Sequence, residues 1–154
     1  MRLDSTSPAL DRLTESSTGI RFGYALVGLL FLVSGLLKAT HFAGLVAKLA
    51  AMGLPMAPLL SVLVTCVEVG CGGALILGWK TRWAAAVLAM FVVPATFLFH
   101  AFWAADASSY SNQLNHFLKN VGLFGALLAM AWTPSSGVAG ADGRATQYPR
   151  LEKD

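Results

Sequence analysis

Four long apolar stretches dominate this chain, and the ionisable residues inside them gather toward one end of the stretches. We place the stretches at 21–38, 57–79, 82–104 and 113–132. Each is long enough, at about 1.5 Å of rise per residue, to cross a hydrocarbon layer about 30 Å thick as an α-helix. Segments of this kind constrain the fold more than any other feature of the chain, because they need lipid or one another as surroundings.

The composition agrees with a membrane protein. Hydrophobic residues make up 56% of the chain, and charged residues make up only 12%, well below the roughly 25% of soluble domains. The net charge of +3 falls mostly at helix ends and tails, a distribution that orients membrane proteins and gives no indication of nucleic-acid binding. We therefore predict an all-α integral membrane protein, a four-transmembrane-helix up-down bundle in contact with the lipid bilayer.

The remaining segments divide the chain into three parts. Residues 1–20 are polar and predict an N-terminal tail with room for a short surface helix. Residues 21–132 form the transmembrane domain in this interpretation, and residues 133–154 form a flexible C-terminal tail. Trp79, Trp83, Trp103 and Trp132 fall near span ends, as membrane-interface anchors do.

The segment between the first two spans has a different pattern. Apolar residues recur at helical spacing over 42–52, whereas Lys48 falls on another face of the helix, and Gly53 and Pro55 then end the pattern. This pattern predicts a short amphipathic helix on the membrane surface.

The distribution of Lys and Arg predicts the orientation. Eight of these residues lie in the N-terminal segment, the 80–82 turn and the C-terminal tail. Lys38 and Lys48 lie on the other side of the predicted bundle. The positive-inside rule then places both termini in the cytoplasm.

Five ionisable residues in or beside the spans indicate a polar site: Lys38, Glu68, His100, His116 and Lys119. A charge at the bilayer centre costs at least about 2.5–3.5 kcal/mol. His100 and His116 fall at one level near the outer end, and Lys119 lies one helical turn deeper than His116 on the same face. Glu68 lies roughly 16 Å below the outer start of its span. We expect Lys119 to be its partner.

Further polar and aromatic residues extend this site. Gln113 and Asn120 continue the polar stripe of the fourth span, and Pro94 predicts a kink that opens the outer half of the third. Trp103 shares a face with His100 and is expected to cover the cavity. We assign catalytic roles to Glu68, His100, His116 and Lys119, and ligand-binding roles to Lys38, Trp103, Gln113 and Asn120.

Structural explanations compete with each of these assignments. The Lys38 side chain could simply extend to the membrane interface and have no role in a site. The two histidines could simply form hydrogen bonds that hold helices together. A Glu68–Lys119 pair with a purely structural role is a further alternative. Cys66 and Cys71 point to different faces of one helix, so we expect small packing residues and no disulfide.

Several segments together resemble the DoxX family: "RFGYALVGLLFLVSGLLKATHF", "MGLPMAPLLSVLVTCVEVGCGGALILGWKTRWAA", "FHAFW" and "NQLNHFLKNVGLFGALL". The resemblance covers about 20–132. It implies a four-helix bundle in a bacterial inner membrane, with Lys38, Glu68 and Arg82 at motif positions but with no catalytic step assigned to them. Some members are the membrane part of a thiosulfate:quinone oxidoreductase, and others are accessory partners in thiol and oxidative-stress systems.

The first functional hypothesis is a quinone-interacting component of a redox system. The family resemblance implies that this redox system acts on sulfur compounds or thiols. His100, His116 and Lys119 supply hydrogen-bond donors for the quinone carbonyls, and Glu68 shuttles a proton. The chain has neither a set of cysteines for an iron–sulfur cluster nor a Rossmann fingerprint. An oxidoreductase of this kind therefore needs a protein partner in a membrane or periplasm-facing complex, or a substrate that reacts directly with bound quinone.

Two alternatives stay open. The chain is equally compatible with a non-catalytic accessory or assembly subunit of a larger membrane complex. A minor alternative is a b-type haem between His100 and His116, or a Glu/His metal site. Because zinc usually takes three or four protein ligands, our site prediction includes no metal.

Overall fold

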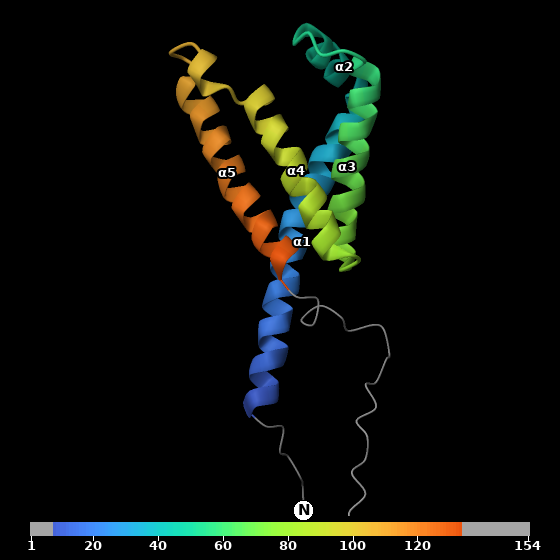
Figure 1. The fold of residues 1–154 in the computed structure, drawn as a ribbon, viewed down its shortest axis with the longest axis vertical. Helices are drawn as coiled ribbons and strands as arrows, with labels where there is room; N and C mark the ends of the chain where they lie inside the picture. Colours follow the sequence, from blue (N-terminus) through green and yellow to red (C-terminus); the bar gives the residue numbers. More distant parts are fainter. Residues whose placement is uncertain (1–7, 134–154) are drawn as a thin grey trace, which may run out of the picture.

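The computed structural model describes residues 8–133, with side chains from residue 18 onward, and this part of the chain is helical without strands. Residues 1–7, and residues 134–154 of the tail predicted at 133–154, lie outside the described residues. In chain order the helices are α1 (Pro8–Thr40), α2 (Phe42–Ala51), α3 (Ala57–Leu77), α4 (Thr81–Phe99), the 3-10 helix η1 (Phe102–Ala104) and α5 (Tyr110–Trp132) (Figure 1).

Three of these helices, within the described residues, are long and apolar enough to cross a membrane. They cover Thr18–Thr40, Ala57–Leu77 and Thr81–Ala104, which confirms three of the four predicted spans. The fourth predicted stretch is also a single helix, α5, but its first half is amphipathic because it carries Gln113, His116 and Lys119. That α5 crosses the membrane remains a prediction.

The first helix begins earlier than the sequence pattern indicated. We expected its start near Arg21, whereas α1 begins at Pro8 and continues without a break to Thr40. Proline is favoured in the first helical turn because its missing N–H would have no partner there. The short helix over 42–52 is confirmed as α2, on which Leu49 is buried.

Tight connections set the helices side by side. Gly78 ends α3 in the left-handed conformation with φ 70°, a conformation that glycine adopts without steric penalty. The Trp79 N–H then donates to the Ala74 carbonyl at 2.9 Å. At its other end α4 runs through Pro94 as one helix and stops at Phe99, where His100 follows as the capping residue.

Glycines bring α1 and α3 into close contact. A Cβ atom on Gly28 would lie 2.6 Å from the Gly72 carbonyl oxygen, and one on Gly72 would lie 2.8 Å from the backbone nitrogen of Leu32. Gly35 is similarly tight, because a Cβ atom there would lie 3.0 Å from that of Glu68. Small residues permit such backbone approach between membrane helices. This contact fixes the distance between the side chains that follow on each helix.

The buried core lies toward the end of the molecule that carries the α3–α4 turn. Leu75, Leu88 and Leu127 are fully buried there. The C-terminal end of α5 is held by two bonds to its terminal carbonyls: Tyr24 Oη donates to Met130 at 3.4 Å and Arg82 Nε donates to Ala131 at 3.1 Å.

The helices diverge toward the other end of the molecule, where α2 lies. Figure 1 shows α5 leaning away from α3, so that the two helices are far apart at the α2 end. The large apolar side chains on the outer faces of α1, such as Leu26, Leu29 and Leu36, are half exposed. These faces suit a lipid environment, and the divergence leaves room for a cavity between the helices.

Candidate functional site

The buried carboxylate of Glu68 pairs with Lys38. The Lys38 ammonium donates to Glu68 Oε2 at 2.7 Å and to Oε1 at 2.9 Å, and also to Ser34 Oγ at 2.6 Å. The Glu68 side chain is 6% exposed and that of Lys38 is 27% exposed. The expected Glu68–Lys119 pair is therefore wrong: Lys119 is exposed on α5, and Lys38 is the partner.

The direction of the side chains explains this partner. A helical Cα–Cβ bond tilts toward the N-terminus of its helix, so the Lys38 side chain extends back along α1 toward Ser34. Because Gly35 brings α1 against α3 beside Glu68, the ammonium reaches the carboxylate. Lys119 lies in the N-terminal half of α5. Figure 1 shows this half of the helix leaning away from α3, which carries Glu68.

A cavity of about 300 Å³ lies beside this ion pair. All five α-helices contribute to its walls. Its polar lining consists of Ser34, Lys38, Lys48, Glu68, His100 and Asn120. The other lining residues are apolar: Leu30, Phe31, Leu45, Val64, Phe91, Val92, Ala95, Phe99 and Leu123. The cavity thus combines an apolar wall with a few polar groups, as small-molecule sites do.

Two open grooves adjoin the cavity and share residues with it. One passes between α1 and α2 and includes Ser34, Lys38 and Lys48. The other follows the exposed apolar face of α1 and shares Leu30 and Ser34 with the cavity. Ser34 lines all three, so the cavity lies next to both grooves at this residue.

His100 and His116 lie side by side, which agrees with the prediction that both fall at the same depth. Their rings stack with centroids 4.9 Å apart and an angle of 11° between planes. His100 Nδ1 also shares a hydrogen bond with Gln113 Oε1 at 3.1 Å. A bis-histidine haem needs a nitrogen on each side of the porphyrin plane, whereas stacked rings present their flat faces to each other. This arrangement does not fit axial haem ligation.

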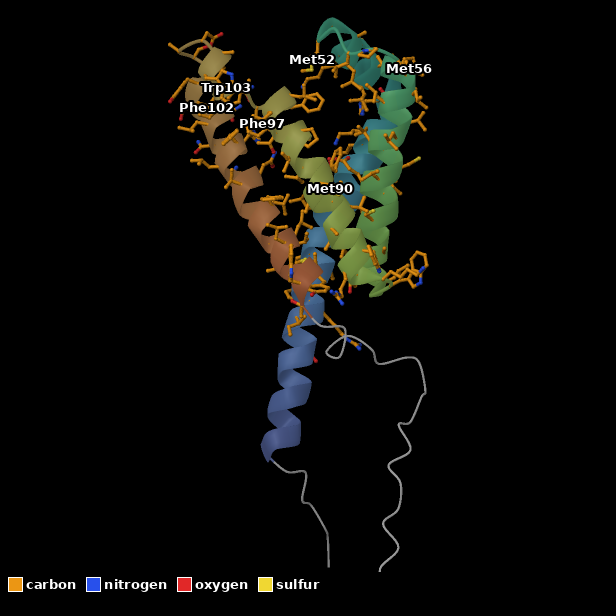
Figure 2. The ribbon with its side chains drawn as sticks, in the orientation of Figure 1. Met52, Met56, Met90, Phe97, Phe102 and Trp103 are labelled. Atoms are coloured by element: carbon orange, nitrogen blue, oxygen red, sulfur yellow. The ribbon has the colours of Figure 1, made fainter. Side chains whose placement is uncertain are left out.

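Trp103 belongs to an aromatic cluster at the start of α5. Its ring centroid lies 5.9 Å from those of both Phe97 and Phe117, and 5.1 Å from that of Phe102. Figure 2 shows Phe97, Phe102 and Trp103 gathered where the chain passes from α4 into η1. Trp103 is not among the residues that line the cavity, so it joins α4 to α5 instead of covering the site.

Lys48 lines the cavity, as we had expected Trp103 to do. Its ammonium lies 4.8 Å from the centroid of the Phe99 ring, which links α2 to the end of α4. We define the mouth of the cavity by Lys48, Phe99 and His100. The sequence prediction included neither Lys48 nor Ser34 among the site residues. The available signals were the single charge of the amphipathic segment and the spacing of four between Ser34 and Lys38.

The loop before α5 is fixed by Asp106. Its carboxylate accepts bonds from the hydroxyl groups of Ser109 and Ser108 and from the Ser109 N–H, all within 2.8 Å. These bonds, the one from the Ser109 side chain foremost, lower the pKa of Asp106 from 3.8 to about 2. The ordered loop sets where α5 begins and thereby where His116 and Asn120 lie.

Cysteines and metal-binding residues are sparse in the described part of the chain. Cys66 is free and exposed on α3, and Cys71 is free and partly buried. Among the described residues no group of three or more His, Cys, Asp or Glu side chains is placed to hold a metal ion.

The fold and site define a helical membrane protein with a polar cavity between its spans. A sequence model of the DoxX family matches residues 21–101, and the chain belongs to this family. It is 29% identical over 107 residues to inner membrane protein YphA of Escherichia coli (strain K12), across 70% of this chain and 76% of YphA. It is 34% identical over 117 residues to inner membrane protein YqjF of the same organism, across 75% and 83% of the two chains.

No solved structure matches the chain significantly. The family match contains Lys38, Glu68 and Arg82 together with the Lys48 and His100 of the cavity mouth, and it ends before α5. The α5 residues of the site, Gln113, His116, Lys119 and Asn120, lie beyond it.

Proposed function

We propose that this chain is a quinone-interacting component of a redox system in a bacterial inner membrane, with the quinone headgroup in the cavity beside Lys38 and Glu68. The observation that carries the proposal is a cavity that is lined by a bonded ion pair and shares Leu30 and Ser34 with an apolar groove on the exposed side of α1. A ligand dissolved in the bilayer needs such a side entrance. Both relatives are named as inner membrane proteins, which supports the location.

The lining fits a quinone headgroup in size and chemistry. A volume of about 300 Å³ lies at the lower end of the ~300–1,000 Å³ typical of small-molecule pockets. Asn120 and His100 offer hydrogen-bond donors suited to carbonyl oxygens, and Phe91 and Leu123 offer apolar surface to a ring. A bound quinone would supply the capacity to accept and release electrons.

The residues of the chain serve proton movement in this proposal. Glu68 is buried, and both of its oxygens accept bonds from Lys38, which is itself partly exposed to the groove at the α2 end. The pair forms a hydrogen-bonded connection between the cavity and that end of the molecule. His100 and His116 lie at the same end, where their rings stack. Electrons come from a protein partner or from a substrate that reacts with the quinone directly.

The orientation in this proposal places α2 and the 105–109 loop outside and the α3–α4 turn in the cytoplasm. Lys80 and Arg82 lie at that turn, and α5 serves as the fourth span. Of the terminal positive residues that also support this orientation, four lie outside the described residues: Arg2, Arg144, Arg150 and Lys153.

Co-purification tests the quinone proposal. The full chain, purified in a mild detergent and extracted with organic solvent, is expected to yield quinone in a ratio approaching one per protein. Asn120→Leu and Glu68→Gln should each lose most of it, since the first removes a donor and the second alters the ion pair.

Cys66→Ala provides a matched control, because Cys66 is an exposed residue of α3 that does not line the cavity. It should retain the quinone. Far-UV circular dichroism establishes that each variant is folded. Quinone that is absent from the wild type, or that remains in folded Asn120→Leu and Glu68→Gln proteins, contradicts the proposal.

A non-catalytic accessory role is the second candidate, and one observation favours it. His116 and Lys119 are exposed on the half of α5 that diverges from α3, so a partner helix has room to contact them. In this case Lys119→Leu should release a partner protein that co-purifies with the wild type, while the quinone content stays unchanged.

A further inference from the structure

The mouth of the cavity carries a positive charge that is not neutralised within the described part of the chain. Three charged side chains line the cavity: Lys38, Lys48 and Glu68. Lys38 donates to both oxygens of Glu68, so these two charges neutralise each other. Lys48 is left over as an unmatched cation beside an apolar chamber.

The groups around Lys48 can receive an anion. Its ammonium lies over the Phe99 ring at 4.8 Å, a contact that still leaves N–H groups on the side away from the ring to donate to a ligand. The side chains of His100 and Asn120 line the same cavity. His100 bonds Gln113 through Nδ1, so Nε2 is available to a ligand. Lys48 on α2, His100 at the end of α4 and Asn120 on α5 thus all line the same cavity.

Most of the remaining lining of the cavity is apolar, and an apolar groove lies next to it. The groove on α1 shares Leu30 and Ser34 with the cavity. Its other lining residues are aliphatic: Leu26, Leu29, Val33 and Leu37. Its volume of about 610 Å³ is twice that of the cavity. A ligand that fills both spaces has a polar head and a long apolar chain.

We propose that the cavity binds a single-chain anionic amphiphile. Its phosphate or carboxylate headgroup bonds Lys48, His100 and Asn120, and its alkyl chain follows the groove along α1. A charged acceptor forms stronger bonds with an ammonium than a neutral one does, so Lys48 selects for an anion. The inference rests on the charge of the mouth; it concerns the same cavity as the proposed quinone function, so the two ligands would compete for that cavity.

Three probes of matched structure test the two halves of the ligand. The full chain in a non-ionic detergent is titrated with dodecyl phosphate, with dodecanol, which lacks the charge, and with inorganic phosphate, which lacks the chain. We expect dodecyl phosphate to bind at least about tenfold more tightly than either of the others. Dodecanoate forms the fourth arm: tighter binding of dodecanoate assigns a carboxylate headgroup, and tighter binding of dodecyl phosphate assigns a phosphate.

Two lysines in equivalent contacts supply the variant and its control. Lys48→Gln should weaken dodecyl phosphate binding about tenfold, and Lys48→Arg should retain most of it. Lys80 also lies over an aromatic ring, that of Trp79 at 5.2 Å, but at the opposite end of the molecule. Lys80→Gln should leave binding unchanged.

Two results overturn the proposal. One is dodecanol binding as tightly as dodecyl phosphate, and the other is an equal loss of affinity in Lys48→Gln and Lys80→Gln. Because no quinone is added or measured, failure here leaves the co-purification result standing, and failure of the co-purification test leaves the amphiphile result standing.

Discussion

At the scale of single residues, the Lys38–Glu68 pair is the most consequential feature of the protein. The carboxylate has a side chain that is 6% exposed and accepts two bonds from one ammonium. A buried ion pair contributes little net stability, but the loss of one member leaves an uncompensated charge. The pair therefore makes each partner necessary to the other, whichever function the cavity serves.

A double-mutant cycle measures this dependence. Lys38→Met should lower the free energy of unfolding by about 2–3 kcal/mol, less than the ~3–5 kcal/mol of a fully buried pair, because the Lys38 side chain is 27% exposed. Glu68→Gln in the Lys38→Met background should recover much of the loss. Unfolding by SDS, monitored by far-UV circular dichroism, gives the free energies of unfolding of the single and the double variant.

Lys119→Met is the control for this cycle. Lys119 is exposed and makes no pair with Glu68, so its replacement should change the unfolding free energy by less than about 0.5 kcal/mol. A loss with Lys119→Met that matches the loss with Lys38→Met would argue against the assigned pair.

Asp106 gives a prediction about pH. Its pKa is lowered from 3.8 to about 2 by bonds to the charged carboxylate. The stabilisation of the loop is therefore complete above pH 3.8 and is lost as the pH falls toward 2. NMR titration of the Asp106 carboxyl carbon should show a midpoint near 2, and Ser109→Ala should move that midpoint up toward 3.8. An unchanged midpoint in Ser109→Ala would contradict the assigned cause.

At the scale of the helices, the contact between α1 and α3 decides the geometry of the site. Gly28 and Gly72 each lie against the backbone of the facing helix. Backbone atoms cannot rotate away from an added methyl group as a flexible side chain can. The close spacing of α1 and α3 therefore requires glycine at these two positions. The distance between the Lys38 ammonium and the Glu68 carboxylate depends on that spacing.

Neighbouring glycines test this contact. Gly72→Ala should destabilise the protein by about 1–3 kcal/mol through overpacking. Gly73→Ala should be neutral or stabilising by up to about 1 kcal/mol, because alanine is the better helix former and a Cβ atom there meets nothing within 4 Å. SDS unfolding compares the two variants, and equal effects would show that α1 does not approach α3 at Gly72.

At the scale of the whole molecule, the bundle is closed at one end and open at the other. Buried leucines and the bonds from Tyr24 and Arg82 hold α5 near the α3–α4 turn. Toward α2 the helices separate (Figure 1), and the cavity lies among them. A four-span arrangement places the open end at one membrane surface.

Cysteine labelling tests the fourth span. In a Cys66→Ala, Cys71→Ala background, Ser108→Cys should react with a membrane-impermeant maleimide in intact spheroplasts. Thr133→Cys should react only after permeabilisation, because α5 separates the two positions. Labelling of both positions from the outside would show that α5 does not cross the membrane.

The sequence was sufficient for the features that depend on local pattern. Apolar runs of membrane-spanning length predicted α1, α3 and α4, and the spacing of apolar residues around Lys48 predicted α2. Counting along the helices also placed His100 and His116 at one level, where the structure stacks their rings. These features follow from helical rise and periodicity, which any stretch of sequence specifies by itself.

Only the tertiary structure decided which polar groups meet. Depth counted along the helices favoured Lys119 as the partner of Glu68, because the count treats all spans as parallel and equally close. In the fold, glycine contacts bring α1 to α3 while α5 leans away, so Lys38 reaches the carboxylate and Lys48 reaches the cavity mouth. Helix separation and tilt arise from packing between distant segments, and no local pattern in the sequence encodes them.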